Sequence, residues 1–373
     1  MIYLDNAATT LIKPRAVSGE MLRALTTAAS PGRGGHHAAM TAAKIVYRCR
    51  EAVAEMFNVT APEQVVFTYN ATHALNIAIN SLVKKGDRVL ISGYEHNSVT
   101  RPLAAIGCEI ITARSPLFDR TAAIEAFRTE IKNADLVVCT HVSNVFGFIL
   151  PVYEIAQLCK EHSVPFIVDA SQSAGILDLD FQKLGAAFMA MPGHKALFGP
   201  QGTGILLCAD VGKVFMSGGS GSDSRSQLMP DFLPDRHEAG THNVPGIAGL
   251  FAGINYVSAC GLKNIRSHEN ALLKEIAWNL CELEEVEVFY ADNENQISVL
   301  SFRCNNIGCE ELAGKLAEEG VCVRSGLHCS PYAHETAGTI ETGTVRLSVS
   351  PFVTLENTKD FCRILQNLLN QTA

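Results

Sequence analysis

The sequence predicts an α/β fold in which a mostly parallel sheet is covered by helices, followed by a smaller α+β domain. Two observations lead to this prediction. Short apolar runs alternate with segments of helical periodicity over the first two thirds of the chain. These runs are rich in β-branched residues and read as strands buried on both faces, which is typical of parallel sheets.

The predicted elements follow one another in a regular order. The strands are 65-VVFTY, 88-RVLIS, 109-EIITA, 135-DLVVCT, 165-PFIVDA and 204-GILLC, with helical segments between them such as 42-AAKIVYRCREAVAEMF and 151-PVYEIAQLCKEH. The glycine-rich segment 217–246 carries Arg, His and Glu among its glycines, which indicates a long functional loop. A long helical stretch is expected from about Gly246 to Glu285, and then strands near 296-QISVLSF and 344-TVRLSVS around a helix at 309-CEELAGKLAEEG. We therefore expect an N-terminal segment 1–14 packed with the small domain, a large domain 15–249 and a small domain 250–373.

Composition excludes several classes of protein. The chain has 373 residues, of which 47% are hydrophobic, so it can bury a large core. Its net charge of −8 and the lack of a long basic run argue against nucleic-acid or anionic-membrane partners. Neither a signal peptide nor a membrane anchor is predicted. The 12 cysteines include no CxxC pair, which favours free thiols in a reducing cytoplasm, most of them buried, as expected for Cys139, Cys159 and Cys208.

Polar side chains follow four of the predicted strands and the apolar segment Leu184 to Met191, at the strand ends where a parallel sheet binds its ligands. They are Asn70 to His73, Glu95 to Asn97, His141 to Asn144, Asp169 to Gln172, and His194 with Lys195. The first group precedes a helix, so it could cradle a phosphate or simply cap that helix. Together the groups suit pyridoxal 5′-phosphate, whose phosphate needs a cradle, whose pyridine nitrogen needs a carboxylate and whose aldehyde needs a lysine. Beside a cationic cofactor ring, Lys195 would have a lowered pKa.

Three motifs then identify a family. The segments 169-DASQSAG, 193-GHKALFGPQGTG and 324-RSGLHC resemble the class V aminotransferase family and, within it, the cysteine desulfurases of the group close to the selenocysteine lyases. The resemblance runs from 3-YLDNAATT to 344-TVRLS. It implies fold type I of the PLP-dependent transferases, with a seven-stranded sheet in the large domain.

The resemblance also implies roles for individual residues. Asp169 would pair with the pyridine nitrogen, Gln172 would touch the ring oxygen and His96 would stack on the ring, while Thr72 and His194 hold the phosphate and Lys195 forms the Schiff base. Asn144 and Arg346 would clamp the substrate carboxylate, a task suited to the planar guanidinium. Thr241 resembles a threonine that reaches the phosphate of a partner subunit, which implies a homodimer.

Two regions depart from the family pattern. Pro192 stands where many desulfurases carry a serine, and a proline offers neither a hydroxyl nor a backbone N–H. We expect Thr72, His73 or a glycine amide of the partner loop to replace the lost phosphate contact. In 31-PGRGGHH, Arg33, His36 or His37 could line the mouth of the site or belong to a solvated loop.

Cys329 decides the finer assignment. Taken alone it is one more thiol among 12, but Arg324, His328 and His334 make its loop electropositive, a setting that favours a reactive thiolate. A metal site of His328, Cys329 and His334 is disfavoured because it lacks a fourth ligand and the usual spacing. In the family the cysteine at this position takes the sulfur.

The resemblance therefore implies an enzyme that converts L-cysteine into L-alanine and a persulfide on Cys329, with L-selenocysteine as a further substrate candidate and an unidentified sulfur acceptor. Two alternatives stay open. One is another PLP enzyme of the family, such as a selenocysteine lyase, another β-lyase or a transaminase, in which Cys329 is incidental. The other is a non-catalytic sulfur-trafficking module. A nicotinamide-binding fold is set aside because no GxGxxG follows the first strand.

Overall fold

The large domain is built around a seven-stranded sheet in the order β2-β8-β7-β6-β5-β3-β4. The computed structural model describes residues 1–32, 34–222 and 224–372. The strands are β2 (Val65–Thr68), β3 (Arg88–Ser92), β4 (Glu109–Ala113), β5 (Leu136–Thr140), β6 (Phe166–Asp169), β7 (Phe188–Pro192) and β8 (Gly204–Cys208). Strands β4, β3, β5, β6 and β7 pair in parallel, whereas β8 is antiparallel to both of its neighbours. The predicted mostly parallel, seven-stranded sheet is confirmed.

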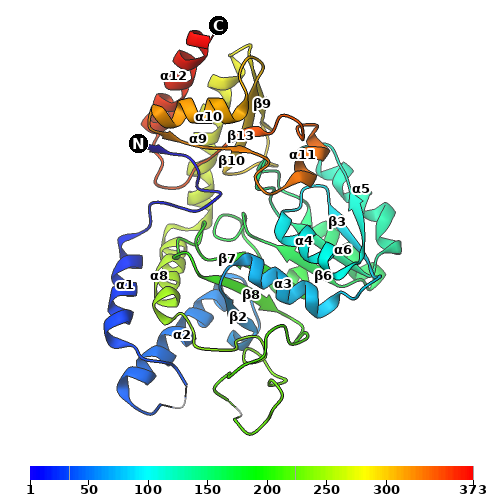
Figure 1. Cartoon of the computed structure of the whole chain (residues 1–373), viewed down its shortest axis with the longest axis vertical. Coiled ribbons are helices and arrows are strands. Elements are labelled where there is room, and N and C mark those ends of the chain that lie inside the picture. The colour runs from blue at the N-terminus through cyan, green and yellow to red at the C-terminus, as the bar shows by residue number, and fades with distance from the viewer. Residues whose placement is uncertain (33, 223, 373) are drawn as a thin grey trace.

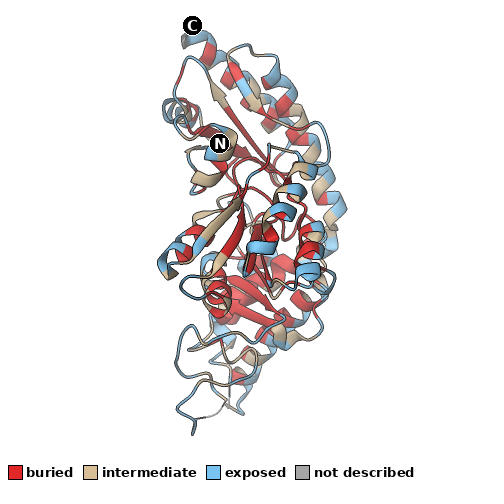
Figure 2. Ribbon diagram, turned by 90° about the vertical axis from the view of Figure 1, so that its right-hand side faces the viewer, coloured by how far each residue is buried: buried red, intermediate tan, exposed pale blue. Residues whose placement is uncertain are grey.

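Both faces of this sheet are buried, which explains why its strands are apolar throughout. Successive side chains of a strand point to opposite faces. In β5, Leu136 and Val138 join one hydrophobic cluster and Val137 and Cys139 join another. The buried strands lie in the middle of the large domain in Figure 2, with the exposed faces of the helices outside them. Cys159 and Cys208 are also buried, as predicted, but the expectation that most cysteines are buried is wrong, because only four of the 12 are.

Helices cover the sheet on both sides (Figure 1). Those of the large domain are α1 (Arg15–Thr27), α2 (His37–Met56), α3 (Ala71–Leu82), α4 (Asn97–Ile106), α5 (Arg120–Glu130), α6 (Val152–His162), α7 (Phe181–Leu184) and α8 (Val244–Cys260), with 3₁₀ turns at Pro62–Gln64 and Ile131–Asn133. The domain boundary predicted at residues 249 and 250 falls inside α8, and side chains of α8 as far as Ile254 belong to a core cluster of the large domain.

The expected long helix after residue 246 is broken into two. Helix α8 ends at Cys260 and α9 (Leu262–Cys281) begins after Gly261, with an angle of 81° between them. Gly261 has φ +79°, a backbone conformation that residues with a Cβ rarely adopt. The sequence has helical periodicity on both sides of Gly261, so the break was not predicted.

The small domain carries a second hydrophobic core under a four-stranded antiparallel sheet, in the order β12-β13-β10-β9. Its elements are β9 (Val286–Phe289), β10 (Val299–Cys304), α10 (Cys309–Glu318), β11 (Val321–Cys322), β12 (Arg324–Gly326), α11 (Pro331–Ala337), β13 (Thr344–Ser348) and α12 (Leu355–Thr372). They gather above the large domain in Figure 1, with α11 reaching down toward α4.

Residues 2–10, the N-terminal strap, connect the two domains. Strand β1 (Ile2–Tyr3) pairs in parallel with β11, and Leu4 enters the small-domain core. Further along, the side chain of Asn6 donates a hydrogen bond to the backbone oxygen of Ser348 at 2.9 Å. The backbone N–H of Thr10 donates to the backbone oxygen of His194 at 3.2 Å. The strap therefore runs from the small domain to the residue before Lys195.

The long loop between β8 and α8 is held by a buried ion pair. Glu238 of this loop pairs with Arg50 of α2 and accepts a hydrogen bond from the backbone N–H of Phe67 at 2.6 Å. Burial alone would raise the pKa of Glu238, but Arg50 and His242 outweigh it and the net shift is downward. The predicted functional loop is thus anchored to the sheet close to Thr241.

None of the described helices is by itself long and apolar enough to span a bilayer; α8 and α9 reach that length and composition only as a bent pair.

Candidate active site

A cavity of about 210 Å³ lies at the ends of the parallel strands. It is lined by most of the residues that the sequence placed at the strand ends, because those ends meet at one edge of the sheet. These lining residues are Thr72, His96, Asn144, Asp169, Gln172, His194 and Lys195, with Asn70, Ser98 and Pro192 beside them.

Asp169 and Gln172 are fixed on the wall formed by β6. The carboxylate of Asp169 ends the strand, is buried, and accepts a hydrogen bond from the backbone N–H of Ser171 at 2.9 Å. The amide of Gln172 donates to the backbone oxygen of Ala7 in the strap at 3.1 Å. The strap therefore orients one of the cavity-lining side chains.

His96 presents a neutral ring. It caps α4, since its Nδ1 accepts a hydrogen bond from the backbone N–H of Ser98 at 3.0 Å. Burial and the charge of Lys195 lower its pKa. Because Nδ1 of His96 accepts this capping hydrogen bond, the imidazole is held in one orientation.

Lys195 has an amine of lowered basicity. Burial lowers its pKa from 10.5 to about 8, and Asp169 opposes this shift without cancelling it. The sequence analysis also expected a lowered pKa for Lys195, but from a cofactor ring, whereas here burial in the protein is the largest cause. Its neighbour His194 has a pKa lowered to about 4 by burial, and its Nδ1 lies 3.1 Å from the hydroxyl of Thr9 in the strap.

The N-terminus of α3 forms the cavity wall next to β2. Asn70 caps this helix by accepting a hydrogen bond from the backbone N–H of His73 at 2.8 Å, so the capping interpretation of Asn70 is confirmed. The hydroxyl of Thr72 does not cap the helix and lies 2.8 Å from the hydroxyl of Ser98. The sequence analysis did not single out Ser98, although it stands two residues after His96.

His73 and Thr241 lie apart from this cavity. The ring of His73 stacks on Tyr69 with centroids 5.0 Å apart, and burial lowers its pKa. Both residues line a different, small cavity of about 40 Å³. Within one chain, the structure does not bring them to Lys195.

His36 and His37 of the segment 31-PGRGGHH also lie away from this cavity. His36 caps α2, with its Nδ1 3.3 Å from the backbone nitrogen of Ala39, and neither His36 nor His37 lines the cavity beside Lys195. Arg33 lies outside the described residues.

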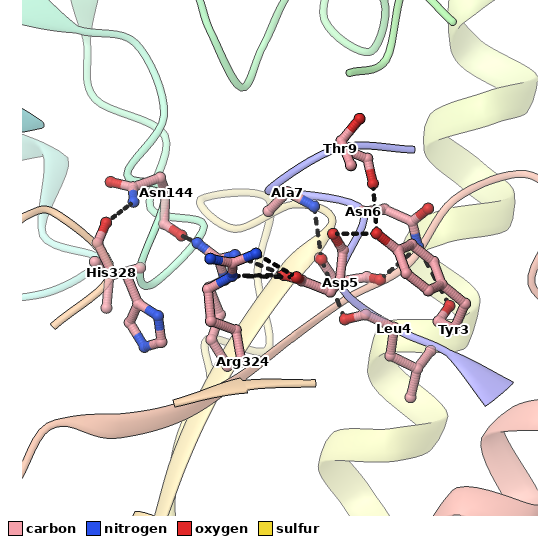
Figure 3. Close-up of polar contacts among 12 residues, drawn as sticks. Tyr3, Leu4, Asp5, Asn6, Ala7, Thr9, Asn144, Arg324 and His328 are labelled. Atoms are coloured by element: carbon pink, nitrogen blue, oxygen red, sulfur yellow. Dashed lines mark hydrogen bonds and ion pairs between the residues drawn. The ribbon is translucent and has the colours of Figure 1, made fainter. Parts of the chain in front are cut away.

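Arg346 is buried and shares the carboxylate of Asp5 with Arg324; Asp5 and Arg324 are labelled in Figure 3. Asp5 of the strap accepts from Nη2 of Arg346 at 2.8 Å and from Nη2 of Arg324 at 2.8 Å. Nη1 of Arg346 donates to the backbone oxygen of Asn144 at 3.0 Å. The sequence analysis missed Asp5, because its two partners are more than 300 residues away in the chain.

We expect the Asp5→Ala variant to lose about 3 to 5 kcal/mol of unfolding free energy, because it leaves the guanidinium of Arg346 buried without its counter-charge. Urea unfolding of the cofactor-free protein measures this loss. Asp360→Ala is the control, since it removes a surface ion pair with Arg363 and should cost no more than about 1 kcal/mol. Equal losses in the two variants would contradict the importance of the buried pair.

Cys329 is exposed at the domain junction, although its neighbours His328 and Ser330 are buried. Its backbone oxygen accepts a hydrogen bond from the N–H of Asn97 at 2.8 Å, so the loop is attached to the residue that follows His96. The expected electropositive setting needs a correction. Burial lowers the pKa of His328 to about 2 and that of His334 to about 4, which leaves both rings neutral, so positive charge comes from Arg324 and Arg346.

Within the described residues, no group of three or more His, Cys, Asp or Glu side chains is arranged to hold a metal ion.

Comparison with known proteins places this geometry in context. The family model described as Aminotransferase class-V matches residues 2–361. A probable cysteine desulfurase of Methanothermobacter thermautotrophicus is 33% identical, over 100% of this chain and 94% of its own length. A cysteine desulfurase of Shigella sonnei is 30% identical, over 88% of this chain and 84% of its own length. The apo structure of cysteine desulfurase from Thermococcus onnurineus superposes with a TM-score of 0.92 at 31% identity, covering 99% of this chain and 95% of that one.

Proposed function

Since the chain belongs to the class-V aminotransferase family, we propose that it is a PLP-dependent cysteine desulfurase, which removes sulfur from L-cysteine to give L-alanine and a persulfide on Cys329. The observation that carries this proposal is a juxtaposition. The cavity beside Lys195 is lined by Asp169 and His96, and the loop of Cys329 is hydrogen-bonded to the residue after His96.

The side chains that line the cavity fit pyridoxal 5′-phosphate. Asp169 supplies a buried carboxylate for the pyridine nitrogen, Gln172 an amide for the ring oxygen and His96 a neutral, flat ring. When bound, the cofactor supplies an electron sink beside the substrate α-carbon.

The phosphate would be held by the α3 N-terminus together with Thr72 and His194. The first N–H groups of a helix have no partner within the helix and attract anions. Ser98 supports this assignment, because its hydroxyl lines the cavity next to that of Thr72. Ser98 thus offers the hydroxyl that Pro192 lacks.

Lys195 would hold the proton that the substrate α-carbon loses. A base works best when its pKa lies near the working pH, and the pKa of about 8 meets that condition. At neutral pH, the free-amine fraction of such a lysine is about 300-fold larger than that of a lysine with an ordinary pKa.

We expect Lys195 of the cofactor-free protein to react with pyridoxal 5′-phosphate at a rate that rises with pH and levels off above about 8, since deprotonation of the amine limits the reaction. Borohydride trapping at a series of pH values, followed by the mass of the peptide containing Lys195, measures the midpoint. The exposed Lys84 serves as an internal reference. A midpoint for Lys195 as high as that of Lys84 would be evidence against the lowered pKa.

Arg346 would bind the substrate carboxylate. A guanidinium has five N–H donors. Two donate to Asp5 and Asn144, and among the described residues the Nε of Arg346 has no hydrogen-bond partner. The remaining N–H groups of Arg346 can face a substrate carboxylate, while Asp5 holds the guanidinium in place.

Cys329 would take the sulfur of the substrate. Its thiolate forms a bond to the substrate sulfur while the Cβ–S bond of the substrate breaks, and the electron pair and a proton end on Cβ. Overall, two thiols become one persulfide and one methyl group. Sulfur is oxidised as Cβ is reduced, so no external oxidant is needed.

A homodimer is part of the proposal. Thr241 lines cavities other than the one beside Lys195, and the loop that carries it is anchored by Glu238. These features support a role of Thr241 at the phosphate of a second copy of the chain.

The proposal is tested by mixing purified protein with L-cysteine and a reductant, and then measuring alanine, sulfide and the mass of the peptide containing Cys329. We expect equal amounts of alanine and sulfide, and one added sulfur atom on that peptide when the reductant is omitted. Pyruvate in place of alanine would indicate a different β-lyase, and an unmodified Cys329 peptide would contradict the persulfide.

A further inference from the structure

Ser330, the residue after Cys329, has an unusual hydrogen-bond partner. It occupies the position before α11, where a serine normally accepts a hydrogen bond from the first helical turn. The side chain makes no such bond. Instead, its fully buried hydroxyl donates to Oδ1 of Asn144 at 2.6 Å.

The amide of Asn144 contacts both neighbours of Cys329. Its Nδ2 donates to the backbone oxygen of His328 at 2.9 Å, as Figure 3 shows, while its Oδ1 receives the hydroxyl of Ser330. A carbonyl oxygen can only accept, so His328 determines which end of the amide faces it. The hydroxyl of Ser330 must then be the donor at the other end.

The backbone at Cys329 requires such support. His328 and Cys329 have φ of +49° and +59°, in the left-handed region that residues with a Cβ adopt at a cost. Conformations of this kind persist where the surroundings hold them. Here the holding contacts are those of Asn144 and the hydrogen bond from the backbone N–H of Asn97 to the oxygen of Cys329.

We propose that Ser330 is a positioning residue for the sulfur transfer, because its hydroxyl locks the Asn144 amide that holds the Cys329 loop. This inference rests on the proposed desulfurase function. The same Asn144 also lines the cavity beside Lys195, and its backbone oxygen accepts from Arg346. The second N–H of the Asn144 amide remains for the substrate carboxylate. Asn144 therefore links substrate binding to the position of the Cys329 thiol.

The test compares two reactions of the cofactor-loaded Ser330→Ala variant. Desulfuration of L-cysteine needs Cys329, whereas exchange of the α-hydrogen of L-alanine in D₂O needs only Lys195 and the cofactor. We expect kcat for desulfuration to fall about 10- to 100-fold, because a displacement of about 1 Å has effects of that size. At saturating L-alanine, the exchange rate and the cofactor absorbance should stay within about twofold of wild type, since Ser330 does not contact the proton-transfer residues.

Two further variants serve as controls. Ser330→Thr keeps a hydroxyl at the same place and should recover most of the lost turnover. Thr336→Val removes another hydrogen bond of α11, from the hydroxyl of Thr336 to the backbone oxygen of Gly93 at 2.9 Å, and should leave desulfuration unchanged. The backbone N–H groups of residues 326–330 should exchange faster in Ser330→Ala and not in Thr336→Val.

The possible results are distinct. Wild-type desulfuration in Ser330→Ala, or an equal loss of desulfuration and alanine exchange, would overturn the positioning role. A wild-type protein that exchanges the α-hydrogen of alanine but releases no alanine from L-cysteine would instead refute the proposed function, and the positioning role would fall with it.

Discussion

The Lys195→Ala variant is expected to lose at least about 1,000-fold of its turnover with L-cysteine, because under the proposed function it would lack both the covalent anchor of the cofactor and the base that holds the α-proton. The half-buried position of Lys195 at the cavity and its lowered pKa single it out for both tasks. Alanine release measures the loss. Borohydride treatment in the presence of pyridoxal 5′-phosphate should add no mass to the variant's corresponding peptide.

Lys84→Ala is the matched control, because Lys84 is an exposed lysine of the same domain. It should retain wild-type turnover and trap the cofactor on Lys195. If Lys195→Ala kept even a tenth of the wild-type rate, another residue would have to carry the chemistry.

The second large effect concerns Cys329. We expect Cys329→Ala to lose about 1,000-fold or more of its desulfuration rate, since the variant has no thiolate to accept the sulfur. It should keep the cofactor absorbance and the exchange of the α-hydrogen of L-alanine, because neither needs the thiol. The two assays together separate sulfur transfer from proton transfer.

Cys281→Ala provides the comparison for Cys329. These two are the exposed cysteines of the described residues, and Cys281 ends α9 in the small domain. Its variant should desulfurate like wild type. Full activity of Cys329→Ala with L-cysteine would rule out Cys329 as the sulfur acceptor and favour the β-lyase alternative.

Much of the large domain was predictable because its signals are local. A strand with both faces buried is apolar throughout, and β5 shows why, since its alternate residues enter two different cores. The residues after each strand could be grouped because the ends of parallel strands share one edge. Asp169, His96 and Lys195 therefore came together as predicted around one cavity.

The contacts that were missed depend on the tertiary structure. Nothing near Asp5 in the sequence indicates two arginines, because they are brought to it by the pairing of β1 with β11 and by β13. His328 and His334 looked like sources of charge, but their burial keeps them neutral. Ser330 resembles an ordinary helix cap in sequence, and only the fold shows its hydroxyl directed to Asn144.

The N-terminal strap also bears on biosynthesis. Asp5 and Asn6 are synthesised well before their partners Arg346 and Ser348, which lie 341 and 342 positions later in the chain. Contacts of such separation form only after the segment between the two partners has been translated. The nascent polypeptide therefore cannot form the buried Asp5–Arg346 ion pair until β13 has been synthesised, and Asp5 stays without this partner until then.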